Sequence, residues 1–280
     1  MILSLSVRIA ETFHSKEHAT LDLPSLARIA QDSGYAALCM RASQIGIHSP
    51  PDPLLSASRT LASHHLAVSM VTGNFDLVYN NERGPDCLRN ITPFLDLAQA
   101  LGAPLIRVAL RHTDDIPWAQ RAADQAADRS LSLVHQCHIQ SLFETVEGIE
   151  STLLRIDRPN FGLIYEPANL EQCGQDYGPE TIRRLSPWIR NVYLQNQRLH
   201  PLGSVALDTW CRGAVRFDLL DVPQPGGIDF ARVFEGLQQI QYSQAVTVHQ
   251  SAPQSGTIAE AASATARFLA RWLGSGIDIR

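Results

Sequence analysis

The sequence contains no apolar run of the roughly 18 to 20 residues that a membrane-crossing helix needs. Its first eight residues begin with apolar side chains but lack the basic segment of a secretory leader, and we expect them to form a strand. The five cysteines are odd in number and widely spaced, with no CxxC pair, so neither a disulfide framework nor a zinc ribbon is indicated. A cytoplasmic protein with reduced thiols and no membrane partner is expected.

Excess positive charge is also missing, because 28 acidic and 23 basic side chains give a net charge of -5. Such a balance provides no broad attraction to phosphate backbones or anionic lipids, so nucleic acid is not an expected partner. The glycine pairs lack the spacing of a phosphate-binding loop, and no Gly-x-Ser-x-Gly segment is present. Nucleotide-binding folds and serine hydrolases of that type are therefore not indicated.

Strand-like and helical patterns alternate along the whole chain, which predicts a parallel sheet with helical crossovers. The expected helices occupy residues 23–33, 52–65, 86–101, 117–138, 147–157, 179–188, 229–239 and 258–273. The expected strands end near Arg8, Met40, Thr72, Ala109, Glu144, Glu166, Gln195 and His249. Eight such units predict a single (β/α)8 TIM barrel over residues 1–280. We expect the last helix to pack on the barrel, with a contact between two copies in a homo-oligomer as the alternative.

Two long segments, 74–85 and 197–227, follow the third and seventh expected strands. Both would therefore lie at the C-terminal face of the barrel, where active sites of this fold are found. Loops of this length in a compact domain are usually functional lids or binding loops. We expect both to form walls over a site, with an ordinary loop excursion as the alternative.

The stretch from Gln140 to Asn169 holds two short apolar runs that each end in a carboxylate. The first run ends at Glu144 and the second at Glu166, with a helical pattern between them. Because the ends of barrel strands converge on one face, these two carboxylates are the first candidates for chemistry.

Four segments carry a resemblance to a known family: Leu142-Phe-Glu144, Gly162-Leu-Ile-Tyr-Glu-Pro-Ala-Asn169, Asn191-Val-Tyr-Leu-Gln-Asn196 and Pro225-Gly-Gly-Ile-Asp-Phe230. With the order of elements, they resemble the xylose isomerase-like TIM-barrel superfamily. This superfamily includes sugar epimerases, inosose dehydratases and hydroxypyruvate isomerases. The resemblance covers nearly the whole chain and implies a sugar or polyol as the small-molecule partner.

The resemblance also implies one divalent cation, held by residues at the ends of strands five to eight. Glu144 and Glu166 match the first two ligand positions, whereas Tyr193 and His249 stand where the family has a histidine and a glutamate. Gln195 lies two residues from Tyr193 and so shares its face of the strand. We therefore expect Glu144, Glu166, Gln195 and His249 to hold Mn, Mg, Co or Zn.

Proton transfer next to a carbonyl is the chemistry that the resemblance implies, with Glu144 and His249 as the two catalytic bases. Asn169, Arg198 and Tyr193 are the expected substrate-binding residues, and Arg107 and Arg111 are further candidates. An isomerase or epimerase is the leading hypothesis. The alternative is a barrel that has lost catalysis and binds a sugar-like ligand or a protein partner without metal. A nuclease of the same fold is disfavoured by the net charge.

Overall fold

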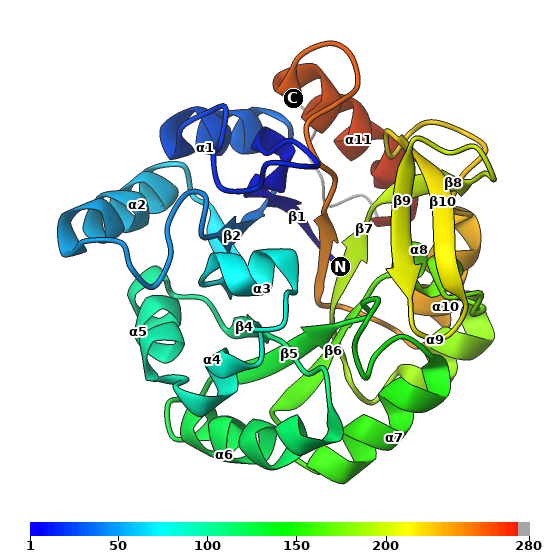
Figure 1. Cartoon of the computed structure of the whole chain (residues 1–280). Helices are drawn as coiled ribbons and strands as arrows, with labels where there is room; N and C mark the ends of the chain where they lie inside the picture. Colours follow the sequence, from blue (N-terminus) through cyan, green and yellow to red (C-terminus); the bar gives the residue numbers. More distant parts are fainter. Residues whose placement is uncertain (274–280) are drawn as a thin grey trace.

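The computed structural model describes residues 1–273, and its eight main strands form a closed parallel barrel surrounded by helices (Figure 1). Each strand pairs with its neighbours in the order of the chain, and the last closes on the first. These strands are β1 (Ile2–Ser6), β2 (Ala37–Arg41), β3 (Ala67–Thr72), β4 (Leu105–Val108), β5 (Ser132–Gln136), β6 (Phe161–Tyr165), β7 (Ile189–Leu194) and β11 (Ala245–Val248). The predicted (β/α)8 barrel is confirmed.

Eleven α-helices lie within residues 1–273, and most of them form the outer ring. They are α1 (Leu23–Asp32), α2 (Pro51–Ser63), α3 (Phe75–Tyr79), α4 (Asp86–Arg89), α5 (Thr92–Leu101), α6 (Ile116–Ala127), α7 (Val146–Ile156), α8 (Pro167–Gln172), α9 (Pro179–Leu185), α10 (Phe230–Gln239) and α11 (Ile258–Leu273). Short 3-10 helices follow β1 (Val7–Ala10) and precede α6 (Thr113–Asp115). None of these helices combines the length and apolar character that crossing a bilayer requires.

Local sequence explains where several helices begin and end. The Asp22 side chain accepts a hydrogen bond from the backbone of Ser25 and so caps α1, and Thr145 caps α7 in the same way. Gly102 ends α5 in the left-handed conformation, with φ of 66°, which glycine adopts readily. The last helix, α11, buries Ala262 and Leu269 against the barrel, as predicted.

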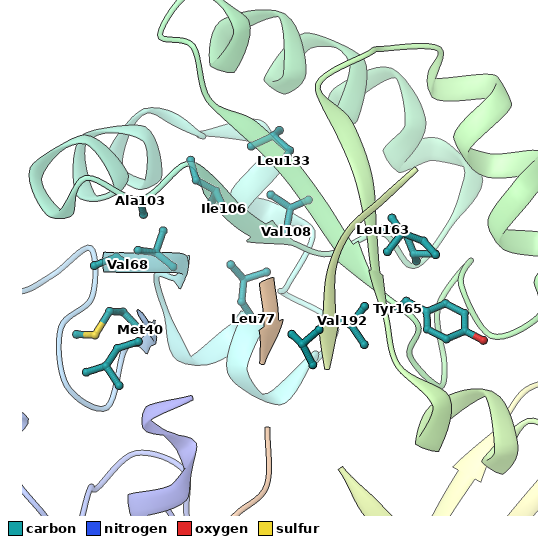
Figure 2. Close-up of a cluster of buried hydrophobic side chains, with 14 of the residues drawn as sticks. Met40, Val68, Leu77, Ala103, Ile106, Val108, Leu133, Leu163, Tyr165 and Val192 are labelled. Carbon is teal, nitrogen blue, oxygen red and sulfur yellow. The ribbon is translucent and has the colours of Figure 1, made fainter. Parts of the chain in front are cut away.

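Side chains on successive strand positions point alternately to the helices and into the barrel. Figure 2 shows the helix-facing set, which includes Ile106, Val108 and Leu163. The inward-facing set forms a separate apolar cluster that fills the barrel: Cys39, Met70, Leu105, Val134, Ile164 and Tyr193. Because this cluster closes the interior, any ligand site lies above it, at the C-terminal ends of the strands.

The fifth strand is the one barrel strand whose predicted position is wrong. The expected helix over 117–138 ends at Ala127, and the chain turns at Ser130, which has φ of 57°. Residues Ser132–Gln136 then pair with β4 and β6, whereas Glu144 lies in the following loop. The apolar residues Leu131 and Val134 are three apart, so they imitate a continuing helix although they belong to a turn and a strand.

The segment 197–227 also contains secondary structure that the sequence did not predict. It forms an antiparallel sheet of β8 (Asn196–Leu199), β9 (Val205–Thr209) and β10 (Gly213–Leu220), with β10 in the middle. In Figure 1 this sheet stands to one side of the barrel mouth. The segment 74–85 begins with α3, whose N-cap is Asn74.

Candidate active site

A layer of polar side chains lies directly above the apolar cluster. Most residues of this layer stand two positions after a residue of the cluster on the same strand, and side chains two positions apart point to the same face. Arg41 follows Cys39 on β2, and Arg107 follows Leu105 on β4. The same spacing produces Gln136, Glu166 and Gln195 at the ends of β5, β6 and β7. Together with Arg8 after β1 and His249 after β11, these side chains line the floor of a cavity of about 470 Å³.

The walls of this cavity come from segments that follow the strands. They include Phe13, His14 and Lys16 after β1, Val78 and Tyr79 of α3, residues 138–140 after β5, and Ala206, Leu207, Asp208 and Phe217 of the β9–β10 hairpin. Both long segments expected to cover a site do line the cavity. It therefore has a rigid polar floor and walls built from loops, a short helix and a hairpin.

Three buried guanidinium groups share the floor. Arg41 forms an ion pair with the buried Glu11, with Nη2 to Oε2 at 2.9 Å and Nε to Oε1 at 3.0 Å. Arg8 donates from Nη1 to Gln195 Oε1 at 2.8 Å and to the backbone oxygen of His249 at 3.3 Å. Burial lowers the pKa of Arg8 to about 10, with Arg41 adding to the effect, so Arg8 is charged at neutral pH. The floor therefore concentrates positive charge out of contact with bulk water.

Arg107 differs from the other two because no hydrogen bond or ion pair joins its side chain to any group within residues 1–273. It is only 2% exposed and nevertheless lines the cavity. Burial lowers its pKa, but a guanidinium stays protonated in proteins. An unpaired charge in such a place is costly unless a ligand neutralises it.

Glu166 is the carboxylate of the floor, and it is 1% exposed. It accepts hydrogen bonds from the side-chain amides of Gln136 and of Asn169, the latter at 2.6 Å. Burial raises its pKa, while the charges of Arg8 and Arg107 act in the opposite direction. A carboxylate with a raised pKa is a stronger base than one in water, and two amides fix its orientation.

His249 is held in place from three sides. Its ring stacks on Tyr193 with 3.8 Å between centroids, Nδ1 lies 3.2 Å from Ser6 Oγ, and Nε2 lies 3.4 Å from Arg41 Nη1. Because a guanidinium only donates, Nε2 accepts and Nδ1 carries the proton. Burial lowers the pKa of His249 well below its usual value, and Arg8 and Arg41 add to this. The imidazole is therefore neutral, and its acceptor nitrogen is engaged by Arg41.

Lys16 is a titratable group of the wall. Its Nζ lies 5.6 Å from the ring centroid of Phe13 and 5.4 Å from that of Tyr79. Burial lowers its pKa to about 7, with further contributions from Arg8 and Arg41. Lys16 can therefore exchange a proton at neutral pH, as a general acid or base must.

The structure brings part of the predicted site together. Glu166, Gln195, His249 and Asn169 all line the cavity. Tyr193 lies one layer lower, buried beneath His249, with its hydroxyl 3.3 Å from Cys39 Sγ. Arg198 is about half exposed and lies 3.6 Å from Asp218 on β10, away from the cavity lining.

Glu144 also lies outside the cavity lining. Its Oε1 accepts from the backbone amides of Gln140 at 2.5 Å and Trp210 at 2.8 Å, and its Oε2 accepts from the amide of Cys211 at 2.8 Å. Trp210 and Cys211 form the turn between β9 and β10. In this arrangement Glu144 fastens the hairpin to the loop after β5. Its expected roles in catalysis and metal binding stay predictions that this position does not favour.

Arg8, Lys16, Arg41 and Gln136 are among the cavity residues that were not identified as site candidates from the sequence. Arg41 could have been identified as a site candidate, because it ends the apolar strand β2 and lies two positions after Cys39, on the same face. Gln136 was hidden because its strand was assigned to a helix. Lys16 lies in a loop whose path no local pattern defines.

The family resemblance implies a divalent cation, and the strand-end residues allow its fit to be tested. Gln136, not a glutamate, stands at the end of β5, so the floor offers one carboxylate, two amides and an imidazole. The acceptor nitrogen of that imidazole already faces Arg41, and three guanidinium groups surround the donors. A dication needs compensating anionic ligands, so this floor does not fit one.

Among residues 1–273, one group of three side chains brings its possible ligand atoms within 4.8 Å of one another: Glu144, Cys173 and Cys211. None of the three lines the cavity. Both oxygens of Glu144 are already engaged by backbone amides. This group therefore does not supply a metal to the floor.

Comparison with known proteins supports the fold assignment. No family model matches the sequence. An inosose dehydratase from Geobacillus thermodenitrificans is 28% identical over 128 residues, which cover 45% of this chain and 43% of that protein. The alignment thus spans less than half the length of this curated relative.

Several solved structures share the barrel at low identity. The probable 3-DHS dehydratase AsbF of Bacillus anthracis has a TM-score of 0.71 at 12% identity, covering 96% of this chain and 98% of that one. A xylose isomerase-like TIM barrel protein from Mycobacterium smegmatis, solved with magnesium, has a TM-score of 0.69 at 13% identity, covering 98% of this chain and 97% of that one. D-allulose 3-epimerase from Methylomonas, solved with D-allulose, has a TM-score of 0.69 at 13% identity, covering 97% of each chain. This chain therefore shares the (β/α)8-barrel fold of these proteins over nearly its whole length.

Proposed function

We propose that this protein is an isomerase or epimerase of a sugar-like small molecule that moves a proton next to a carbonyl without a resident metal. One observation carries this proposal: Glu166, a buried carboxylate with a raised pKa, shares the cavity floor with Arg8 and Arg107. A base and positive charge side by side are what removal of such a proton requires. The similarity to dehydratases and an epimerase supports the same class of chemistry.

In the proposed reaction the Glu166 carboxylate takes the proton from the carbon next to the carbonyl. The C–H electron pair becomes the carbon–carbon double bond, and the carbonyl π pair moves to oxygen. Arg8 and Arg107 stabilise the resulting enolate oxygen. At 4 Å and an effective dielectric constant of about 20, one such charge pair is worth about 4 kcal/mol. The guanidinium groups thus do the task that a cation would do elsewhere.

Proton return completes the reaction in one of two ways. Protonated Glu166 can deliver its proton to the former carbonyl carbon while the hydroxyl proton on the first carbon passes to the enolate oxygen, which moves the carbonyl to the first carbon and gives isomerisation. Alternatively, the Lys16 ammonium delivers a proton to the original carbon from the wall, which gives epimerisation. Lys16 suits this task because its pKa is about 7. His249 holds Arg41 in this scheme, and Glu144 holds the hairpin.

A second candidate is a barrel that binds a sugar-like ligand without turning it over. The floor has one carboxylate, and the acceptor nitrogen of His249 is engaged by Arg41, so Glu166 is the one base available among the floor residues. This candidate predicts ligand binding with no exchange of carbon-bound protons.

The test is solvent exchange in deuterium oxide, followed by proton NMR on ketoses, inososes and sugar acids. Chelator-treated wild-type protein should exchange the proton next to the carbonyl of at least one compound. Glu166→Gln should lose about 100-fold or more of that rate. Glu235→Gln, which changes an exposed glutamate on α10, should behave as wild type. Full exchange in Glu166→Gln, or its loss on chelation, would refute the mechanism.

A further inference from the structure

We infer that the ligand of this cavity is a sugar acid, whose carboxylate binds between Arg8 and Arg107 on the floor. This inference rests on the proposed function in taking the ligand to be sugar-like. It adds that the ligand is a monoanion whose carboxylate is the carbonyl group next to the reacting carbon. Arg8 and Arg107 therefore bind this carboxylate and stabilise the enolate oxygen that forms on it, deepest in the barrel.

The charges of the floor give the first argument. The Arg41 guanidinium is neutralised by Glu11 at 2.9 Å. Of the remaining charges, Glu166 offsets one of the two guanidinium groups of Arg8 and Arg107. One positive charge is left over on the floor, and an isolated buried charge is strongly disfavoured. Lys16 and Asp208 of the wall carry opposite formal charges and leave this count unchanged. A ligand with a single negative charge balances the positive charge left over.

The unused donors give the second argument. Arg8 uses Nη1 for Gln195 and the His249 backbone, and its Nη2 has no acceptor within residues 1–273. Arg107 has no acceptor in the same part of the chain, although it lines the cavity. A guanidinium presents its N–H groups in a planar fork that matches a carboxylate, with two parallel hydrogen bonds. Neutral hydroxyls would leave these charges uncompensated.

The charge of the floor also distinguishes a carboxylate ligand from a phosphate ester. A phosphate dianion would leave the floor with a net negative charge next to the Glu166 carboxylate. A carboxylate leaves it neutral. Asn169 Oδ1 and Gln195 Nε2 make no hydrogen bond within residues 1–273 and remain available around it for sugar hydroxyls.

Calorimetric titration of the whole protein tests the inference with matched pairs of probes. D-gluconate and D-galactonate are compared with D-glucitol and D-galactitol, which have the same carbon skeletons without the charge, and with D-glucitol 6-phosphate. We expect at least one acid to bind 10-fold or more tighter than its neutral partner and than the phosphate ester. Its affinity should fall as sodium chloride is raised.

Variants locate the binding. Arg107→Gln should weaken binding of the acid about 10- to 100-fold and leave that of the neutral polyol unchanged. Arg59→Gln, on the exposed face of α2, is the matched control and should have no effect. Arg107→Gln should fold, because it removes an unpaired buried charge; Arg107→Met provides a second variant of similar volume. Equal affinity for acids and polyols, no binding of either acid, preference for the phosphate ester, or unchanged affinity in both Arg107 variants would overturn the inference.

The binding assay separates this inference from the proposed function. Glu166→Gln removes a negative charge beside the carboxylate and should bind the acid at least as tightly as wild type, whether or not the protein is an enzyme. Tight acid binding with no proton exchange in any compound would refute the proposed reaction alone. Proton exchange in neutral ketoses without acid binding would refute the inference alone.

Discussion

Replacing Glu144 by alanine should release the β9–β10 hairpin without removing the catalytic base. The three backbone amides bound by this carboxylate belong to Gln140, Trp210 and Cys211. Hydrogen bonds to a charged acceptor contribute roughly 1.5 to 3 kcal/mol each, but exposed turn amides regain water when the bonds are lost. We expect a net loss of about 2 to 4 kcal/mol, localised to the hairpin rather than shared by the barrel.

Hydrogen exchange measures this loss at the affected amides. The amides of Trp210 and Cys211 should exchange about 30- to 1,000-fold faster, since each 1.4 kcal/mol is a factor of ten. Glu144→Gln supplies a graded control, because its amide oxygen can still accept from Gln140 and Trp210 while its NH2 group faces Cys211. Cys211 should therefore lose more protection than Trp210 in that variant. Unchanged exchange at both amides would refute the assignment. Complete loss of turnover in Glu144→Gln with the hairpin intact would instead support the catalytic role predicted from the sequence.

Three further outcomes are expected. Glu11→Gln should lower the free energy of unfolding by about 3 to 5 kcal/mol in urea titrations, because it leaves the Arg41 guanidinium buried without its carboxylate; a loss below 1 kcal/mol would contradict this. Burial lowers the pKa of His135 to about 3 and that of His249 well below 6.5, so the unfolded chain takes up protons that the folded chain does not. Stability should therefore fall as pH drops below 6.5, by about 1.4 kcal/mol per pH unit for each imidazole, and a flat profile between pH 7 and 5 would disprove it. Gln136→Glu places a second carboxylate on the floor and should weaken sugar-acid binding 10-fold or more in calorimetry, whereas unchanged affinity would count against an anion site there.

The fold could be predicted from the sequence because its signals are local and repeated. Apolar runs recur in every unit, and several units add a capping residue such as Asp22 or a turn glycine such as Gly102, so one misplaced strand did not change the architecture. The predicted position of the fifth strand was wrong because the spacing of Leu131 and Val134 fits both a helix and a strand.

The site was harder to predict because its charge balance depends on residues from many strands at once. Glu166, Gln195 and His249 were recognised as strand-end residues, and each lines the cavity. The end of the fifth strand was predicted eight positions too late, at Glu144 instead of Gln136. The sequence therefore predicted a carboxylate at a position of the floor where the structure has an amide. Arg8 and its partner Gln195 are 187 positions apart in the sequence, so their 2.8 Å contact leaves no local signal.

In our proposal, guanidinium groups occupy the role that a cation has in a metal-dependent barrel. The most direct test is a pair of calorimetric titrations on the same chelator-treated protein, one with manganese and one with a sugar acid from the panel above. We expect one acid bound per chain, dependent on Arg107, and no manganese bound in the cavity. Stoichiometric manganese binding that is lost in Glu166→Gln, and that the acid requires before it binds, would contradict it.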